Sequence, residues 1–127
     1  MNKSEQLENR LIDFAVDVMN LAEKLPNTRS GNYLSGQIIR SGTAPALLYG
    51  EVRAAESKKD FIHKMKVALK ELRETLVSLK IILKKQFPIN LQNCETLKSE
   101  CNELVSIFVS STKTTDKNIK QSLIKKS

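Results

Sequence analysis

The sequence is poor in the residues that build turn-rich and aromatic-rich folds. Its 127 residues include no tryptophan, two tyrosines, four phenylalanines, four glycines and three prolines. An all-β sandwich or barrel needs frequent glycine- and proline-containing turns between short strands, so this composition argues against one. Hydrophobic residues make up 40% and charged residues 28% of the chain, which allows a single domain with one buried core.

Cysteine and histidine are also scarce. Cys94 and Cys101 lie seven residues apart. On a helix this spacing separates their Cα atoms by ~10.5 Å, beyond the ~7 Å that a disulfide spans. Two cysteines and one histidine also fall short of a four-ligand zinc site. The sequence therefore predicts two small apolar core residues, no metal and no cofactor.

Long apolar runs are missing. No stretch approaches the ~20 apolar residues that a membrane-spanning helix requires. Residues 1–10 carry both acidic and basic side chains and lack the apolar segment of a secretory signal. We therefore expect a cytoplasmic protein that does not enter a membrane.

Motifs for catalysis are missing as well. The sequence has no phosphate-binding glycine loop, no nucleophile elbow and no zinc-binding helix motif. His63 is the only histidine, and a general base also needs a partner and a pocket. A non-enzymatic protein is therefore expected. The alternative, an enzyme acting through His63 and Glu51, requires a buried pocket that joins the two side chains.

Helical periodicity is what the sequence has in abundance. Apolar residues recur at spacings of three and four in four segments, near residues 4–25, 32–56, 57–85 and 90–113. The connections between them are short, which predicts an all-α, antiparallel up-down four-helix bundle.

Two features modify this bundle. Pro45 lies inside the second segment, where it predicts a kink or a break. The small residues around it predict a notch for close helix packing, with a ligand-binding backbone loop as the alternative; they are Ser41, Gly42, Ala44 and Ala46. Beyond Lys113 the apolar pattern fades, so we expect the bundle to span residues 1–113 and residues 114–127 to form a basic, flexible tail.

The net charge of +7 is spread unevenly. Residues 57–85 hold nine basic and three acidic residues, and the residues after Lys113 add a net +3, whereas residues 1–25 are net −2. Four basic residues of the third segment stand seven apart and form one stripe, with Lys70 and Lys84 beside it: Lys59, Lys66, Arg73 and Lys80. On a helix this stripe is ~31 Å long. It suits the phosphates of a nucleic acid; the alternative is an ordinary solvated face.

Two apolar stripes run along the same segment. The first follows strict heptad spacing, and the second repeats every seven residues beside it: Ile62, Leu69, Leu76 and Leu83. Together they make a face wider than one neighbouring helix covers. The second stripe is therefore predicted to form an oligomer interface.

Several motifs in the centre of the chain resemble those of a known family. They are residues 39–46 (IRSGTAPA), Tyr49-Gly50-Glu51, residues 54–64 (AAESKKDFIHK) and residues 69–75 (LKELRET). With them the chain resembles the bacterial four-helix-bundle proteins encoded in 23S ribosomal RNA intervening sequences, over about residues 14–113. Relatives commonly carry asparagine where this chain has Leu48, so a polar contact made by that asparagine is not expected here.

The resemblance implies a four-helix bundle that assembles as a homopentamer. It also implies kinship with the accessory variability determinant of diversity-generating retroelements, a basic pentamer that binds nucleic acid and a reverse transcriptase. The leading hypothesis is a non-enzymatic homo-oligomer that binds RNA or DNA through phosphates. The alternative is a scaffold whose basic surface binds an acidic protein partner, without a nucleic-acid role.

Overall fold

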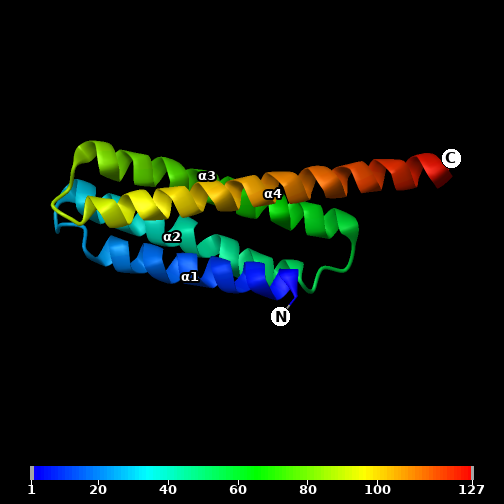
Figure 1. Ribbon diagram of the computed structural model, residues 1–127, viewed down its shortest axis with the longest axis horizontal. Helices are drawn as coiled ribbons and strands as arrows, with labels where there is room; N and C mark the ends of the chain where they lie inside the picture. The colour runs from blue at the N-terminus through cyan, green and yellow to red at the C-terminus, as the bar shows by residue number, and fades with distance from the viewer. Residues whose placement is uncertain (1, 127) are drawn as a thin grey trace.

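The computed structural model describes residues 2–126 and contains four helices (Figure 1). They are α1 (Lys3–Glu23), α2 (Arg29–Val52), α3 (Lys58–Lys85) and α4 (Leu91–Lys126). Successive helices run antiparallel and lie side by side. The contact between α1 and α4 is less extensive than those between the other neighbouring pairs. The predicted all-α four-helix bundle is confirmed.

Each of the first three helices has an N-cap residue whose side chain accepts a backbone hydrogen bond. The Asn2 side chain accepts a hydrogen bond from the Glu5 amide, Thr28 from the Gly31 amide, and Ser57 from the Asp60 amide. Each cap satisfies one backbone donor that has no partner within its helix. The helix α3 ends at Lys85 and is capped by Gln86, whose φ of 56° lies in the left-handed region. These short, capped connections set the antiparallel order of the helices.

The core consists of the apolar residues whose spacing predicted the helices. Among the largest side chains below 2% exposure are Phe14 of α1, Ile38 of α2, Leu72 of α3 and Phe108 of α4. Both cysteines are buried on α4, where the thiol of Cys101 lies 3.2 Å from the carbonyl oxygen of Leu72. The prediction that the cysteines are core residues is confirmed.

The helix α2 runs without interruption through Pro45, which is buried. Of the two predicted outcomes, a break is therefore wrong. The proline removes the amide that would bond to the carbonyl of Ser41. The Ser41 hydroxyl lies 2.8 Å from that of Thr75 on α3 and is buried with it. A side-chain contact to α3 thus fixes the chain at the point where the backbone hydrogen bond is missing.

Gly42 accounts for the predicted packing notch. A Cβ atom placed on Gly42 would lie 2.6 Å from Cγ1 of Val18 on α1, closer than such atoms approach. The missing side chain therefore lets α2 approach α1 closely, and packing is confirmed as the use of this position.

The helix α4 is longer than the sequence pattern predicted, because it continues past Lys113 to Lys126. Its last turns project beyond the other three helices (Figure 1). Thr112 is buried, and Asp116 pairs with Lys66 of α3 at 3.3 Å. These contacts attach the beginning of the extension to the bundle, while the flexibility of residues 114–127 stays a prediction.

Candidate nucleic-acid interface

The predicted basic stripe lies on the outer side of α3. All six of its predicted residues are exposed: Lys59, Lys66, Lys70, Arg73, Lys80 and Lys84. The heptad spacing that gathers these cations on one side places the core residues Ala68, Thr75 and Ile82 on the opposite side. The stripe is therefore a continuous solvent-facing row of positive charge along the helix.

Lys66 is the only one of these six whose side chain forms an ion pair within the described residues, with Asp116 of α4. That pair is solvent-exposed, with side-chain exposures of 57% and 43%, so it contributes little stability. The other cations of the stripe keep their hydrogen-bond donors toward solvent, where an anion can approach them.

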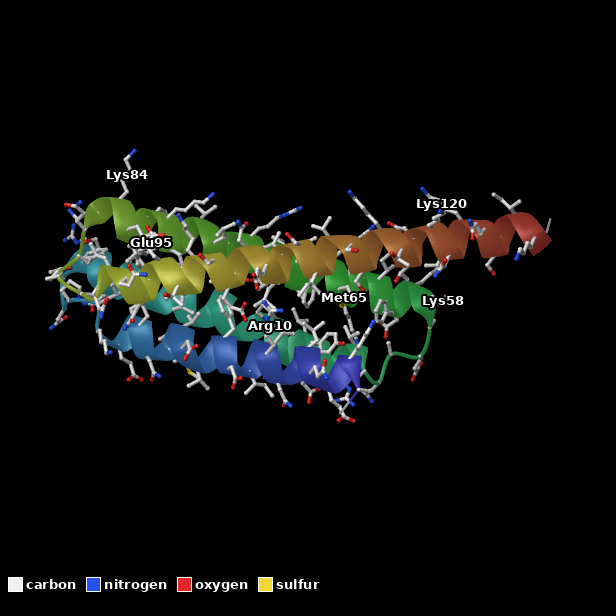
Figure 2. All side chains as sticks on the ribbon, in the orientation of Figure 1. Arg10, Lys58, Met65, Lys84, Glu95 and Lys120 are labelled. Atoms are coloured by element: carbon white, nitrogen blue, oxygen red, sulfur yellow. The ribbon has the colours of Figure 1, made fainter. Side chains whose placement is uncertain are left out.

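The helix α4 adds three cations, of which Lys117 and Lys120 were assigned to the tail on sequence grounds. Lys113, Lys117 and Lys120 are exposed and spaced by four and three residues, so they share one side of α4. The pair between Asp116 and Lys66 places this part of α4 beside α3. In Figure 2, Lys84 and Lys120 extend from the same side of the molecule, near opposite ends of the row.

We call this surface the basic edge. It consists of nine residues: Lys59, Lys66, Lys70, Arg73, Lys80 and Lys84 of α3 with Lys113, Lys117 and Lys120 of α4. The three α4 residues were missed as site residues because an apolar pattern that fades gives no sign that a helix continues. Their spacing of four and three was the available signal.

A shallow hollow of about 830 Å³ lies over the middle of α3. Its walls include Lys66, Lys70 and Arg73 of the basic edge, and Arg40 of α2. The one acidic residue in its lining is Glu74.

Glu74 does not cancel the charge of this hollow. The Arg40 guanidinium bonds to Glu74 at 2.6 Å and to Glu71 at 2.9 Å. This hydrogen bond to Glu74 lowers the pKa of its carboxyl group and raises the pKa of Arg40. The remaining lysines and Arg73 leave the hollow positive, which favours an anionic partner.

The outer side of α3 is not purely polar. Val77 lines the same hollow and is 54% exposed, and Ile81, one turn further on, is 47% exposed. Phosphates gain nothing from such side chains, whereas a protein partner buries them. The exposed Val77 and Ile81 therefore support the alternative of a scaffold that binds an acidic protein partner.

The four residues predicted to form an oligomer interface are largely buried inside the bundle of a single chain. Ile62 and Leu69 are only 8% exposed, and Leu76 and Leu83 are partly buried and pack against the core. The bundle itself therefore uses much of this second stripe. Its role between chains stays a prediction.

The two residues of the enzyme hypothesis are not buried. His63 and Glu51 are both exposed, and Glu51 lies 3.8 Å from Lys64. Neither side chain lines the hollow on α3 or the groove described next. The buried pocket that this hypothesis requires is therefore not formed by either of these cavities.

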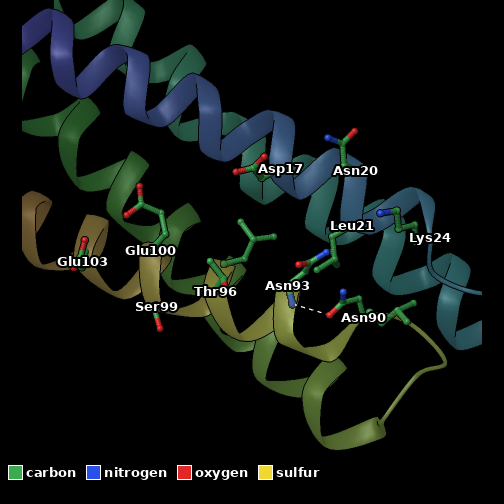
Figure 3. Close-up of a pocket in the computed structure, with 12 residues that line it drawn as sticks. Asp17, Asn20, Leu21, Lys24, Asn90, Asn93, Thr96, Ser99, Glu100 and Glu103 are labelled. Atoms are coloured by element: carbon green, nitrogen blue, oxygen red, sulfur yellow. Dashed lines mark hydrogen bonds between the residues drawn. The ribbon is translucent and has the colours of Figure 1, made fainter.

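A polar groove of about 670 Å³ lies between the end of α1 and the beginning of α4 (Figure 3). Its lining residues come from the end of α1 and the beginning of α4, and include Asp17, Asn20, Asn90, Asn93 and Thr96. Within it, the Asn90 side chain accepts a hydrogen bond from the Asn93 amide at 3.2 Å, which is the dashed line in Figure 3. That bond belongs to the beginning of α4 and leaves the groove without a recognisable catalytic arrangement.

Arg10 bridges α1 and α4 near this groove. Its guanidinium bonds to Glu100 through two nitrogens, at 2.6 and 2.8 Å, and also to Glu103. These carboxylates raise the pKa of Arg10 above its usual range. No group of three or more metal-ligating side chains occurs among the described residues, and none of the described helices is long and apolar enough to cross a membrane.

Comparison with known proteins gives the family. The model for the 23S rRNA-intervening sequence protein family matches residues 5–110. The chain belongs to this family.

A solved structure of similar sequence supports the same assignment. It is a protein of unknown function from the S23 ribosomal protein family of Bacteroides thetaiotaomicron, 30% identical in sequence. The match covers 88% of this chain and 99% of that chain, with a TM-score of 0.78. No curated protein matches this chain. Family membership therefore gives the fold but no established activity.

At Leu48 the resemblance led us to expect no polar contact. The Leu48 side chain is partly buried and packs against the core, so it makes an apolar contact within the bundle.

Proposed function

We propose that this protein is a non-enzymatic, cytoplasmic homo-oligomer that binds RNA or DNA through phosphate contacts along the basic edge. The observation that carries the proposal is the gathering of nine exposed lysine and arginine side chains from two helices on one side of the bundle. Neutralising phosphates with such side chains releases condensed counterions, which supplies most of non-specific affinity.

The shape of the basic edge agrees with backbone contact rather than base reading. The α3 stripe is ~31 Å long, comparable with roughly nine base pairs of a duplex at 3.4 Å each. None of its nine residues is aromatic, so stacking on unpaired bases is not expected there. We therefore expect weak sequence preference.

The assembly proposed is the homopentamer that the family resemblance implies. Five copies would carry a formal charge of about +35 from the +7 of each chain, which strengthens the field at each basic edge. A reverse transcriptase or another protein is a further partner implied by the resemblance.

The test compares two matched variants for binding to a structured RNA by fluorescence anisotropy at low salt. Arg73→Ala with Lys80→Ala removes two cations of the basic edge, and Lys3→Ala with Lys24→Ala removes two exposed cations at the two ends of α1. We expect the first variant to lose about tenfold or more in affinity and the second to stay close to the unmodified protein. Equal loss in both, or no RNA binding at low salt, would contradict the proposal.

The alternative function is a scaffold for an acidic protein, favoured by the exposed Val77 and Ile81. Replacing both with serine separates the two functions. RNA binding through phosphates keeps its affinity in this variant, because no cation is removed. A protein interface centred on these side chains is weakened, since hot spots depend on buried apolar anchors.

A further inference from the structure

One aromatic side chain of the protein is exposed to solvent. All six aromatic residues lie in the described part of the chain, and Tyr33 of α2 is the only one of them that is exposed, at 66%. The other tyrosine, Tyr49, is buried, and its ring meets that of Phe108 edge-on at a centroid distance of 6.2 Å. Tyr33 therefore stands outside the core, with its ring open to solvent.

The contacts between α2 and α3 place Tyr33 beside the basic edge. Arg40 of α2 bonds to Glu71 and Glu74 of α3. Tyr33 comes seven residues before Arg40, a shift of two helical turns or ~10.5 Å that keeps both side chains on the same side of α2. Because α3 runs antiparallel to α2, the same shift along α3 leads from these two glutamates to residues 78–81. Tyr33 therefore lies level with that stretch of α3.

Cations of the basic edge stand on both sides of this level. Lys80 lies within residues 78–81, Lys84 is one turn further along α3, and Arg73 is two turns before Lys80. All three are exposed, and none of them forms an ion pair within residues 2–126. The two glutamates of α3 nearest to them are paired with Arg40. An aromatic ring thus stands next to a row of cations that are available to phosphates.

The surface next to Tyr33 is also open. Gly36 comes three residues later on the same side of α2, and a Cβ atom placed there would meet nothing within 4 Å. Glycine inside a helix lowers its stability relative to alanine, and no contact within the bundle explains this glycine. The missing side chain leaves room for a flat ring to lie against that of Tyr33.

We propose that Tyr33 stacks on an unpaired base of the nucleic acid whose phosphates contact the basic edge. The basic edge itself supplies no aromatic ring, and Tyr33 supplies one from the neighbouring helix. Every base has a π-face, so stacking of this kind adds affinity with little sequence preference. The inference rests on the proposed function and specifies the class of strand as one with unpaired nucleotides. A fully paired duplex gains nothing from Tyr33, because its bases stack on one another.

A protein is the other class of occupant for this position. Ile81 lies at the same level of α3 and is 47% exposed, so a protein partner would cover it together with Tyr33. The neighbouring cations favour a nucleic acid, because a strand places a base and its phosphates within reach of the ring and the lysines together. The tests below separate the two occupants, since only the nucleic acid depends on a base.

The first test uses two single strands of equal charge, with binding measured by fluorescence anisotropy at low salt. One is a DNA strand of about twelve nucleotides without self-complementarity, and the other has the same length with abasic residues throughout. We expect Tyr33→Ala to lose about fivefold or more in affinity for the strand with bases and nothing for the abasic strand. Alanine favours the helix, so this variant stays folded. Its salt dependence is unchanged, because no cation is removed.

Two control variants accompany this test. Tyr33→Phe keeps the ring and is expected to keep the affinity for both strands. Ile12→Ala removes a side chain of α1 that is 45% exposed, away from the basic edge, and is expected to change neither affinity.

The outcomes separate this inference from the proposed function. Full affinity of Tyr33→Ala for the strand with bases would overturn the stacking, while binding of a blunt duplex would still support the basic edge. Equal loss for both strands would show that Tyr33 acts through the fold or the assembly, and would overturn the stacking as well. If the unmodified protein binds neither strand nor the duplex, the proposed function fails and the inference fails with it.

The second test places a reporter at the site. The sequence contains no tryptophan, so Tyr33→Trp gives a protein with a single indole ring at the position of the tyrosine. Stacking on a base quenches indole fluorescence. We expect quenching with the strand that has bases, and little change with the abasic strand or the blunt duplex. An unquenched signal when the strand with bases is bound would contradict the inference.

Discussion

At the scale of single residues, closeness of packing gives the sharpest constraints. Gly42 lets α2 approach Val18 of α1, which is fully buried. A methyl group at this position has no free space, because it would lie 2.6 Å from a carbon of Val18. Gly36, six residues earlier on the same helix, has open space around it.

Replacing Gly42 with alanine is expected to destabilise the protein. Overpacking a filled core typically costs about 1–3 kcal/mol, which exceeds the helix-propensity gain of about 1 kcal/mol. Gly36→Ala is the matched control, and there only the propensity gain remains. Urea unfolding at low protein concentration measures both changes. A Gly42→Ala variant as stable as Gly36→Ala would show that α1 and α2 are not packed this closely.

The two cysteines illustrate how burial changes reactivity. Burial raises the pKa of Cys101 to about 12 and that of Cys94 to about 11. Since thiolate is the reactive form, we expect neither thiol of the folded protein to react with a disulfide reagent at pH 8–9, whereas both react in urea.

The same shifts set the sign of a pH effect on stability. The pKa of each thiol is higher in the folded protein than in the unfolded chain, where it is about 8.5. The two buried thiols therefore contribute their full stability only at pH values below about 8.5. This contribution is lost as pH rises from there toward 11–12. A double Cys94→Ala and Cys101→Ala variant is expected to lose less stability between pH 8.5 and 11 than the unmodified protein. If urea unfolding shows the same loss of stability for both proteins over this pH range, the two thiols are exposed to solvent rather than buried.

At the scale of helices, α4 is where sequence and structure differ most. Heptad and three-four spacing predicted all four helices. The same reasoning fails beyond Lys113, since polar residues continue a helix without any apolar signal. Lys117 and Lys120 could not be placed beside α3 from sequence, because that requires the contact between Asp116 and Lys66.

Removing residues 114–127 tests the role of this extension. The bundle is expected to stay folded, because Phe108 and the rest of the core remain, and the exposed pair of Lys66 with Asp116 is worth at most about 1 kcal/mol. RNA affinity is expected to fall, and its dependence on salt to weaken by about two units of slope, since two edge lysines are lost.

A shorter deletion, of residues 122–127, serves as the control because it keeps Lys117 and Lys120. It is expected to bind RNA with nearly the full salt dependence. Full-strength binding after the longer deletion would exclude Lys117 and Lys120 from the basic edge.

At the scale of the whole molecule, the net charge of +7 is concentrated on one side of the bundle rather than spread evenly over its surface. The cations of α3 and α4 gather on one side, and Arg40 neutralises the acidic residues nearest to them on α3. The position of this charge along α3 was predictable from heptad spacing alone. Its extension across two helices depends on tertiary contacts that no local pattern contains.

The affinity for a structured RNA as a function of salt tests the central claim most directly. If about five of the nine edge cations contact phosphates, the logarithm of the binding constant falls with the logarithm of salt concentration at a slope of about −4. Affinity then drops by roughly 10²- to 10³-fold between 50 and 200 mM salt. A slope near zero, or no binding at 50 mM, would contradict the account of the basic edge as a phosphate-binding surface.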